Sequence, residues 1–184
     1  MKKFLLWIAI GGALLYSTSA CSDDNLLGDF SIKSEVTLPD SLVSIKKFRN
    51  YAVKITCSKD TVFQHEYTVK NEESGETETR YYGSKFTSHY YEAEPIYLYW
   101  ALDTLKLDVK SNARFNVTTQ VSSGAPWLTV VSGANSSGDA TVKLRAPQKT
   151  GTMRTSTSTI TILSQDSTVM YKIPVRQYGQ NDYQ

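Results

Sequence analysis

The chain has 184 residues, of which 40% are hydrophobic and 21% are charged. This balance is ordinary for one or two globular domains and excludes a disordered or collagen-like chain. The formal charge is +2, and without Lys2 and Lys3 it falls to zero, because 20 minus 2 basic residues then face 18 acidic ones. A neutral chain has no general attraction for nucleic acid, so no nucleic-acid partner is expected.

Residues 1–20 have the layout of a secretory signal. Lys2 and Lys3 precede an apolar run that ends at Tyr16, and small residues then lead to Cys21. The run is too short to span a membrane as a helix. A cysteine directly after small residues resembles the lipobox of bacterial lipoproteins, which implies that Cys21 is lipidated. A secreted form without lipid is the alternative.

The acidic residues that follow Cys21 open a polar tether, expected over residues 21–29. Ser22-Asp23-Asp24 resembles the signal that sends Bacteroidetes lipoproteins to the outer face of the outer membrane. This resemblance implies a lipid-anchored, surface-exposed protein that touches the membrane through its anchor alone. A tether that needs acidic residues only for solubility would look the same.

Residues 30–103 contain short apolar runs that predict a β-rich region. Cys57 alternates with Val53 and Ile55 and is therefore expected to be buried and inert. Its only possible disulfide partner is Cys21, so lipidation would leave the fold without a disulfide. The polar segment 71–76 lies between two strand-like runs and predicts a hairpin. We expect strands over residues 29–38, 42–57 with a bend near Lys46-Lys47, 61–70, 77–82, 85–91 and 95–102.

Residues 104–179 predict a small β-sandwich, followed by a tail at 180–184. Apolar residues alternate in runs such as Ile160/Ile162 and Val169 to Val175, with turn residues between the runs. This period of two is typical of strands in two packed sheets. No helical pattern of 18 residues follows the signal, so the mature protein is expected to be all-β.

The landmarks of this second region resemble the BACON domain of Bacteroidetes proteins. They are Phe115-x-Val117, Pro126-Trp127-Leu128, Gly138, Arg154 and the closing run Val175 to Gly179. The resemblance implies an immunoglobulin-like sandwich of surface and secreted proteins, with a proposed carbohydrate- or mucin-binding role. It brings no fixed binding residues. The first region could form a second sandwich or pack its strands onto this one, with the boundary at Asp103-Thr104.

Six of the twelve tyrosines fall between Tyr81 and Tyr99, and Trp100 follows them. Strand alternation places Ile96, Leu98, Trp100 and Leu102 in the core and leaves Tyr97 and Tyr99 on the other face. Flat rings on one strand face can stack on sugars, and their hydroxyls can bond to sugar hydroxyls. His89 and Tyr91, or Tyr90, would extend this candidate glycan site. The alternative is that the tyrosines fill an interface between the two regions.

Trp127 is expected in the core of the sandwich, because such a fold needs a large residue there. His65 and His89 are the only histidines, and the sequence has no nucleophile elbow, HExxH motif or phosphate-binding loop. We therefore expect neither an enzyme nor a bound metal or cofactor.

Four short segments resemble the Asp-Ser/Thr-apolar sequence of Bacteroidetes protein O-glycosylation. The resemblance implies that the glycan acceptors are Ser41, Thr61, Thr104 and Ser167. All four are expected at junctions between strands and turns.

Two functions follow from the sequence. The first is a non-catalytic surface lipoprotein that binds glycan or mucin. The second is a structural or spacer module that contacts other surface proteins. An exposed Tyr97/Tyr99 pair would favour the first, and rings buried against residues 104–179 would favour the second.

Overall fold

The computed structural model describes residues 33–46, 48–101 and 103–183, and the chain from Ser34 onward forms one compact unit. Cys21, the expected signal and the expected tether lie outside the described residues. Within these ranges the chain forms strands β1 to β13, the short 3-10 turn η2 (Gln180–Tyr183) and no α-helix. None of its helical segments there is long and apolar enough to cross a membrane. The all-β prediction is confirmed.

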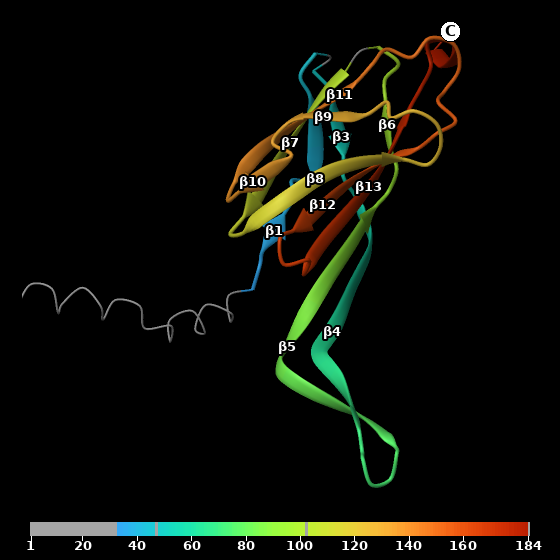
Figure 1. Ribbon diagram of the computed structural model, residues 1–184. Helices are drawn as coiled ribbons and strands as arrows, with labels where there is room; N and C mark the ends of the chain where they lie inside the picture. The colour runs from blue at the N-terminus through green and yellow to red at the C-terminus, as the bar shows by residue number, and fades with distance from the viewer. Residues whose placement is uncertain (1–32, 47, 102, 184) are drawn as a thin grey trace, which may run out of the picture. The chain divides into compact units, whose positions relative to one another are not determined.

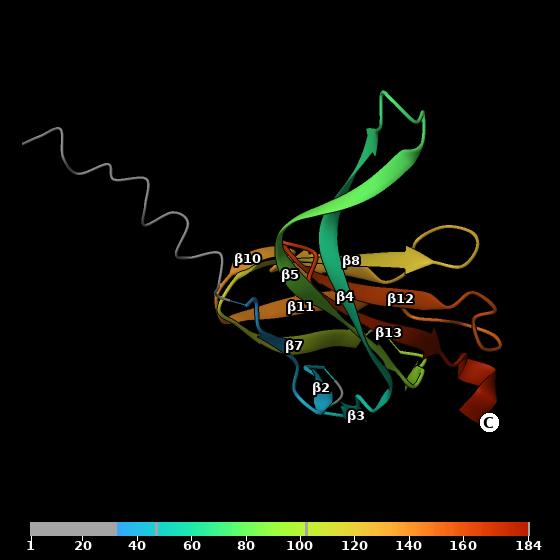
Figure 2. The ribbon, with the colours of Figure 1, turned by 90° about the horizontal axis from the view of Figure 1, so that it is seen from below.

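The strands form two main sheets in a sandwich-like arrangement (Figures 1 and 2). The six-stranded sheet has the order β3-β2-β7-β11-β9, with β1 also on β7. Its strands are β1 (Val36–Thr37), β2 (Ser41–Ser44), β3 (Asn50–Ala52), β7 (Asp103–Ser111), β9 (Thr129–Ser132) and β11 (Ala140–Ala146).

The seven-stranded sheet has the order β10-β8-β12-β13-β5-β4, with β6 also on β13. Its strands are β4 (Ile55–Lys70), β5 (Thr77–Ala93), β6 (Ile96–Leu98), β8 (Arg114–Val121), β10 (Asn135–Ser137), β12 (Ser158–Ser164) and β13 (Val169–Gln177).

The core lies between the inward faces of the two sheets. Alternate residues of β7, β11, β12 and β13 are buried, as the period of two predicts, except at the end residues Ser111 and Ala140. Trp127 is also buried, which confirms its expected place in the core. The hydrophobic core continues into the first half of the chain, where it includes Val36, Leu42, Ile96 and Leu98.

The two regions expected from the sequence share both sheets. In the six-stranded sheet, β1 and β2 pair with β7. In the seven-stranded sheet, β5 and β6 both pair in parallel with β13. The strands of the first region therefore pack onto the second, and the expected boundary at Asp103-Thr104 lies at the start of β7.

Most of the β4–β5 hairpin extends beyond the sandwich (Figure 1). β4 pairs with β5 from Ile55 to Lys70, whereas β5 pairs with β13 only from His89 to Glu92. We call residues 61–88, which pair only with each other, the ribbon. The ribbon has no second sheet against either face in the described part of the chain.

Three details of the first half differ from the sequence expectation. Residues 42–57 are not one bent strand, because β2 and β3 form a hairpin and β4 begins at Ile55. Residues 77–82 and 85–91 belong to one continuous strand, β5. Cys57 is exposed rather than buried, since β4 leaves the sandwich and no opposing sheet covers it.

Candidate functional site

Five aromatic rings gather where β6 and β13 end, and we call them the aromatic cluster: Tyr97, Tyr99, Trp100, Tyr178 and Tyr183. Tyr97 stacks on Tyr178 with 5.4 Å between ring centres and 30° between ring planes. Tyr183 meets the edges of Tyr178 and Tyr99 at 5.5 and 4.8 Å. Tyr97 is 41% exposed and Tyr183 is 48% exposed. The cluster is thus pre-assembled and open to solvent.

The pairing of β6 with β13 places Tyr97 on the outer face of its sheet. Ile96 and Leu98 are buried, as expected, so the residue between them points outward. Trp100, which was also expected in the core, is instead half-buried. Tyr97 lies opposite Arg176 in this parallel pair, and the backbone of Tyr178 donates to Leu98 at 2.9 Å. Both partners of the stacked tyrosine pair are therefore fixed by backbone hydrogen bonds.

Gln177 ties the loops beneath the cluster to the end of β13. Its buried amide nitrogen donates to the carbonyl of Pro147 at 2.9 Å and to that of Tyr99 at 3.4 Å. Its amide oxygen accepts from Arg154 Nε at 2.7 Å. Burial lowers the pKa of the Arg154 guanidinium, which also lies 5.0 Å from the centre of the Trp127 ring.

Gly179 follows Tyr178 at a point where only glycine fits. A side chain there would overlap the backbone of Gly151 and Thr152. The loop at Gly151 therefore packs directly on the chain that carries Tyr178, and this close approach holds the cluster against the sandwich.

Tyr99 is held by a hydrogen-bonded chain that begins in the core. Its backbone nitrogen donates to Tyr51 Oη at 3.4 Å, and that hydroxyl donates to the buried Asp103 at 2.8 Å. Burial and the bond to Asp103 raise the pKa of Tyr51 well above its usual value, so the hydroxyl stays a donor. Arg49 lies 4.2 Å from the centre of the Tyr99 ring and covers one of its faces.

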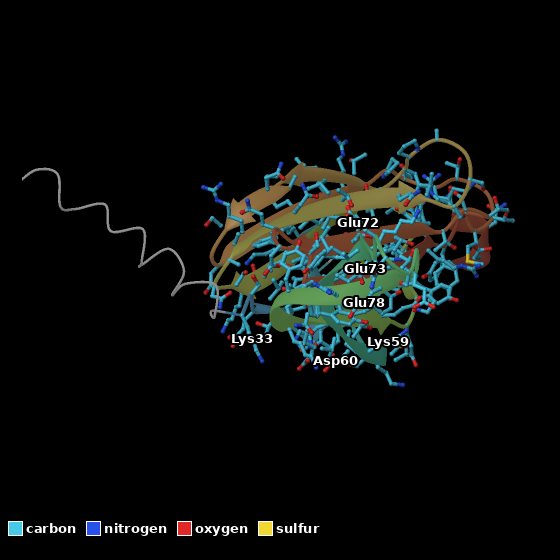
Figure 3. All side chains as sticks on the ribbon, turned by 60° about the horizontal axis from the view of Figure 1, so that its bottom comes forward. Lys33, Lys59, Asp60, Glu72, Glu73 and Glu78 are labelled. Atoms are coloured by element: carbon cyan, nitrogen blue, oxygen red, sulfur yellow. The ribbon has the colours of Figure 1, made fainter. Side chains whose placement is uncertain are left out.

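Tyr91 and His89 do not join Tyr97. They lie opposite the buried Val169 and Tyr171 in the register with β13, on the other face of the sheet from Tyr97. Tyr91 stacks on Tyr171 at 4.5 Å, and burial raises the pKa of Tyr171 to about 12. His89 Nδ1 lies 2.8 Å from an oxygen of Asp60, beside the base of the ribbon (Figure 3).

Tyr90 lies on the same outer face as Tyr97. Burial and the nearby carboxylate of Glu92 raise the pKa of Tyr90, and Lys172 Nζ lies 5.6 Å from its ring centre. Sequence reasoning gave Tyr90 only as an alternative to Tyr91, and it missed Tyr178, Tyr183 and Arg49. The pairing of β6 with β13 brings Tyr178 to Tyr97, whereas Tyr183 and Arg49 contact the neighbouring Tyr99.

The four expected glycan acceptors occupy different settings. Ser41 begins β2, Thr104 is the second residue of β7 and Ser167 lies in the turn before β13, all as expected for junctions. Thr61 lies within β4 instead, which corrects that part of the expectation. Their aspartates also have structural partners, because Asp103 bonds to Tyr51 and Asp60 to His89.

Asp166 organises the turn that carries Ser167. Its carboxylate accepts hydrogen bonds from Ser34, Ser164 and the backbone and side chain of Thr168. Burial acts to raise the pKa of Asp166, but these hydrogen bonds outweigh burial and lower the pKa below the ordinary 3.8. The carboxylate therefore stabilises the fold in its charged form.

This shift predicts a pH-dependent contribution of Asp166 to stability. A depressed pKa gives stability that is fully present above pH 3.8 and lost as the pH falls through the folded-state pKa. Asp166→Asn should destabilise the protein by about 1 kcal/mol at neutral pH. Melting temperatures of both proteins should converge as the pH falls below 3.8, and a constant gap would contradict the prediction.

One further concave feature lies at the other strands of the seven-stranded sheet. A shallow cavity of about 560 Å³ lies where β8, β10 and β12 meet, with Arg114, Asn116, Asn135 and Gln165 in its wall. Within residues 33–46, 48–101 and 103–183, no group of three His, Cys, Asp or Glu side chains could hold a metal ion.

Comparison with known proteins gives one partial similarity. No family model matches the sequence, and no curated protein matches it. One solved structure with a similar part is described as a Bacteroides ovatus GH5 xyloglucanase in complex with a XXXG heptasaccharide, with a TM-score of 0.38 and 14% sequence identity. The similarity covers 46% of this chain and 17% of that chain, so this chain spans under a fifth of that protein. No family assignment follows.

Proposed function

We propose that the protein is a non-catalytic, lipid-anchored protein of the outer membrane surface that binds glycan chains through the aromatic cluster. In this proposal Cys21 carries the lipid, and the sandwich is immunoglobulin-like and of the BACON type. The ligand is a glycan, free or carried on mucin. No cofactor takes part.

The stacked pair of Tyr97 and Tyr178 carries this proposal. Tyr178 covers one face of the Tyr97 ring, so the exposed 41% of Tyr97 belongs to its other face, its edges and its hydroxyl. An aromatic face held in place loses little conformational entropy when a sugar stacks on it. Tyr183, which contacts Tyr178, and Arg176, which lies opposite Tyr97 in the strand register, can donate to sugar hydroxyls.

The geometry also indicates weak binding. Tyr97 is 41% exposed and Tyr183 is 48% exposed, so a sugar would stack on an open surface of the aromatic cluster. A single stacking site of this kind typically gives dissociation constants from high micromolar to millimolar, or about −4 to −6 kcal/mol. Detection therefore needs multivalent display of the glycan.

Tyr97→Ala should reduce binding to an immobilised glycan array or to mucin by at least tenfold, on the order of 1.4 kcal/mol. Tyr81→Ala is the matched control, since Tyr81 is 61% exposed but lies on the ribbon. Both variants should keep the wild-type melting temperature. Unchanged binding by Tyr97→Ala, or wild-type protein that binds no glycan on a broad array, would argue against the proposal.

A second function is favoured by the ribbon. Its exposed large apolar side chains include Phe63, Tyr67, Tyr82 and Phe86, and exposed apolar groups in number are typical of protein contact surfaces. The half-buried state of Tyr99, under Arg49 and beside Tyr183, also agrees with a structural role for part of the cluster. A structural or spacer module at the cell surface is therefore the alternative.

A further inference from the structure

The ribbon exposes paired aromatic rings that make no contact with the sandwich core. Phe63 stacks on Phe86 at 5.5 Å, and Tyr67 meets the edge of Tyr82 at 5.8 Å. All four side chains are exposed. An isolated two-stranded hairpin is marginally stable in water, and an apolar surface on it marks a site of contact with another molecule.

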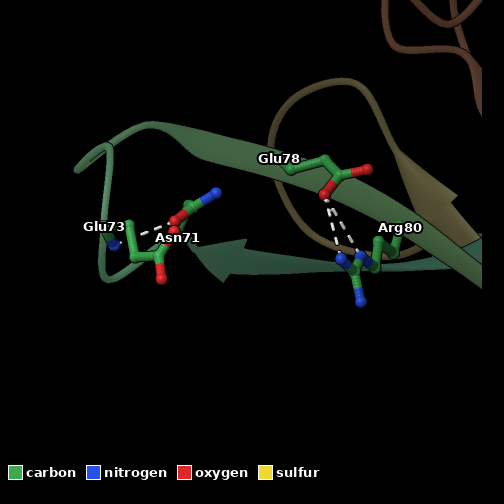
Figure 4. A network of polar contacts seen from close by, with 4 residues as sticks. All are labelled: Asn71, Glu73, Glu78 and Arg80. Carbon is green, nitrogen blue, oxygen red and sulfur yellow. Dashed lines mark hydrogen bonds and ion pairs between the residues drawn. The ribbon is translucent and has the colours of Figure 1, made fainter.

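The turn at the end of the ribbon is acidic and ordered. Residues 71–76 include Glu72, Glu73 and Glu76 and no basic residue, and all of them are exposed. The side-chain oxygen of Asn71 accepts a hydrogen bond from the backbone of Glu73 at 2.9 Å (Figure 4). It accepts a second bond from the backbone of Ser74 at 3.2 Å. Figure 3 shows Glu72 and Glu73 at this end of the ribbon. The tip therefore presents its charge from a fixed backbone.

The outer face of the six-stranded sheet carries the opposite charge. Lys106 and Lys143 lie directly opposite each other in the β7–β11 pair, and Arg145 follows on the same face of β11. Like charges directly opposite across two strands are destabilising. Asp108 forms an ion pair with Lys106 at 3.5 Å. We call Lys106, Lys143 and Arg145 the basic patch.

Apolar side chains flank the basic patch. Val43 lies opposite Lys106 on the β2 side and is 39% exposed, and Val131 of β9 is 60% exposed. The patch thus combines apolar and basic groups, and the ribbon combines apolar and acidic groups. The two surfaces of one chain are complementary in both respects.

The dimensions of the ribbon favour two exchanged contacts between a pair of chains over a single contact. Its strand Thr77–Ser88 would be roughly 40 Å long and two strands roughly 10 Å wide, so one face covers about 400 Å². A single contact of one ribbon with one sheet would bury about 800 Å² in total, which is the size of a crystal contact. Two such contacts, exchanged about a twofold axis, would bury about 1,600 Å², the usual size of a specific interface.

We propose that two copies of this chain form a reciprocal dimer, in which the ribbon of each copy lies on the basic patch of the other. Glu72, Glu73 and Glu76 then lie near Lys106, Lys143 and Arg145 of the partner copy. The proposal is independent of the glycan site, because the aromatic cluster shares no residue with either surface.

Charge reversal tests this arrangement, and the measurement is the mass of the species that the protein forms in solution. The tip variant carries Glu72→Lys, Glu73→Lys and Glu76→Lys, and the patch variant carries Lys106→Glu, Lys143→Glu and Arg145→Glu. Sedimentation velocity should give twice the mass of a single chain for the wild type. Each variant alone should be monomeric, since its tip and its patch repel each other.

An equimolar mixture of the two variants should recover the dimer. In the mixed pair, the basic tip faces the acidic patch and the acidic tip faces the basic patch, so both contacts are complementary again. The control variant Lys54→Glu, Arg114→Glu, Lys149→Glu changes the same number of charges outside both surfaces and should remain dimeric. Circular dichroism checks that every variant is folded.

Three results would overturn the proposal. The first is a monomeric wild type, which would leave the patch to an anionic polymer or to another protein. The second is a mixture that stays monomeric although each variant is folded. The third is a species larger than a dimer, which would indicate open head-to-tail contacts instead of a reciprocal exchange.

Discussion

Trp127→Ala is expected to lower the free energy of unfolding by about 3 to 5 kcal/mol, the range for truncation of a buried aromatic residue. The ring is 5% exposed and lies in the core cluster beside the fully buried Leu128. Arg154 packs against the ring and is itself held by Gln177. The substitution therefore leaves a cavity and also removes the surface on which Arg154 rests.

Urea denaturation followed by circular dichroism measures this loss. Trp100→Ala is the matched control, because Trp100 is half-buried in the aromatic cluster and should cost less. A Trp127→Ala protein with the wild-type denaturation midpoint would place the ring outside the core and make it a candidate ligand contact.

Asp103→Ala is expected to cost about 2 to 4 kcal/mol, because it leaves two hydroxyl donors without their acceptor in the interior. Asp103 is fully buried and accepts hydrogen bonds from Ser44 and Tyr51. These bonds join β2 and β3 to β7. Since Tyr51 also accepts from the backbone of Tyr99, the loss should extend to the aromatic cluster.

Two single substitutions separate the contributions of the two hydrogen bonds to this loss of stability. Ser44→Ala and Tyr51→Phe each remove one donor, and the thermal stability of both should lie between those of the wild type and Asp103→Ala. Asp103→Asn keeps an acceptor oxygen and should cost less than alanine. Equal stability of Asp103→Ala and Asp103→Asn would show that the hydrogen bonds contribute nothing.

Alternation in the sequence was sufficient to predict the strands of the sandwich core. Residues such as Ile160, Ile162 and Ile173 repeat with period two between turns, and the structure buries all of them. A buried Trp127 followed from the same logic. These strands could be predicted because a strand that is buried on one face needs apolar residues at alternate positions of its own sequence.

The same rule was wrong for Cys57, because burial also depends on what lies opposite. Alternation with Val53 and Ile55 indicated one apolar face, yet β4 extends past the edge of the other sheet. A local pattern does not say where the opposing layer ends. The polar segment 71–76 predicted the hairpin of the ribbon, but no local pattern predicted that the hairpin would extend beyond the sandwich.

The tyrosines show a second limit of prediction from sequence. The number of residues between two strands decides which face of the sheet a side chain of the next strand points to. In β5 the residues directed inward include Tyr91 and Ala93, whereas in β6 they are Ile96 and Leu98. The inward positions change from odd to even numbers across Glu94 and Pro95. Tyr91 and Tyr97 therefore point to opposite faces, and only the shared pairing with β13 reveals it.

The parallel pairing of β13 has a consequence for how the protein folds. β5 and β6 are made well before β13, which is their partner on the sandwich side among the described residues. Contacts between residues so far apart in sequence close slowly, because the intervening chain must be ordered first. The β4–β5 hairpin can form within microseconds from local contacts alone. We therefore expect the folding chain to carry this hairpin, with its aromatic side chains, before β13 arrives to complete the sandwich.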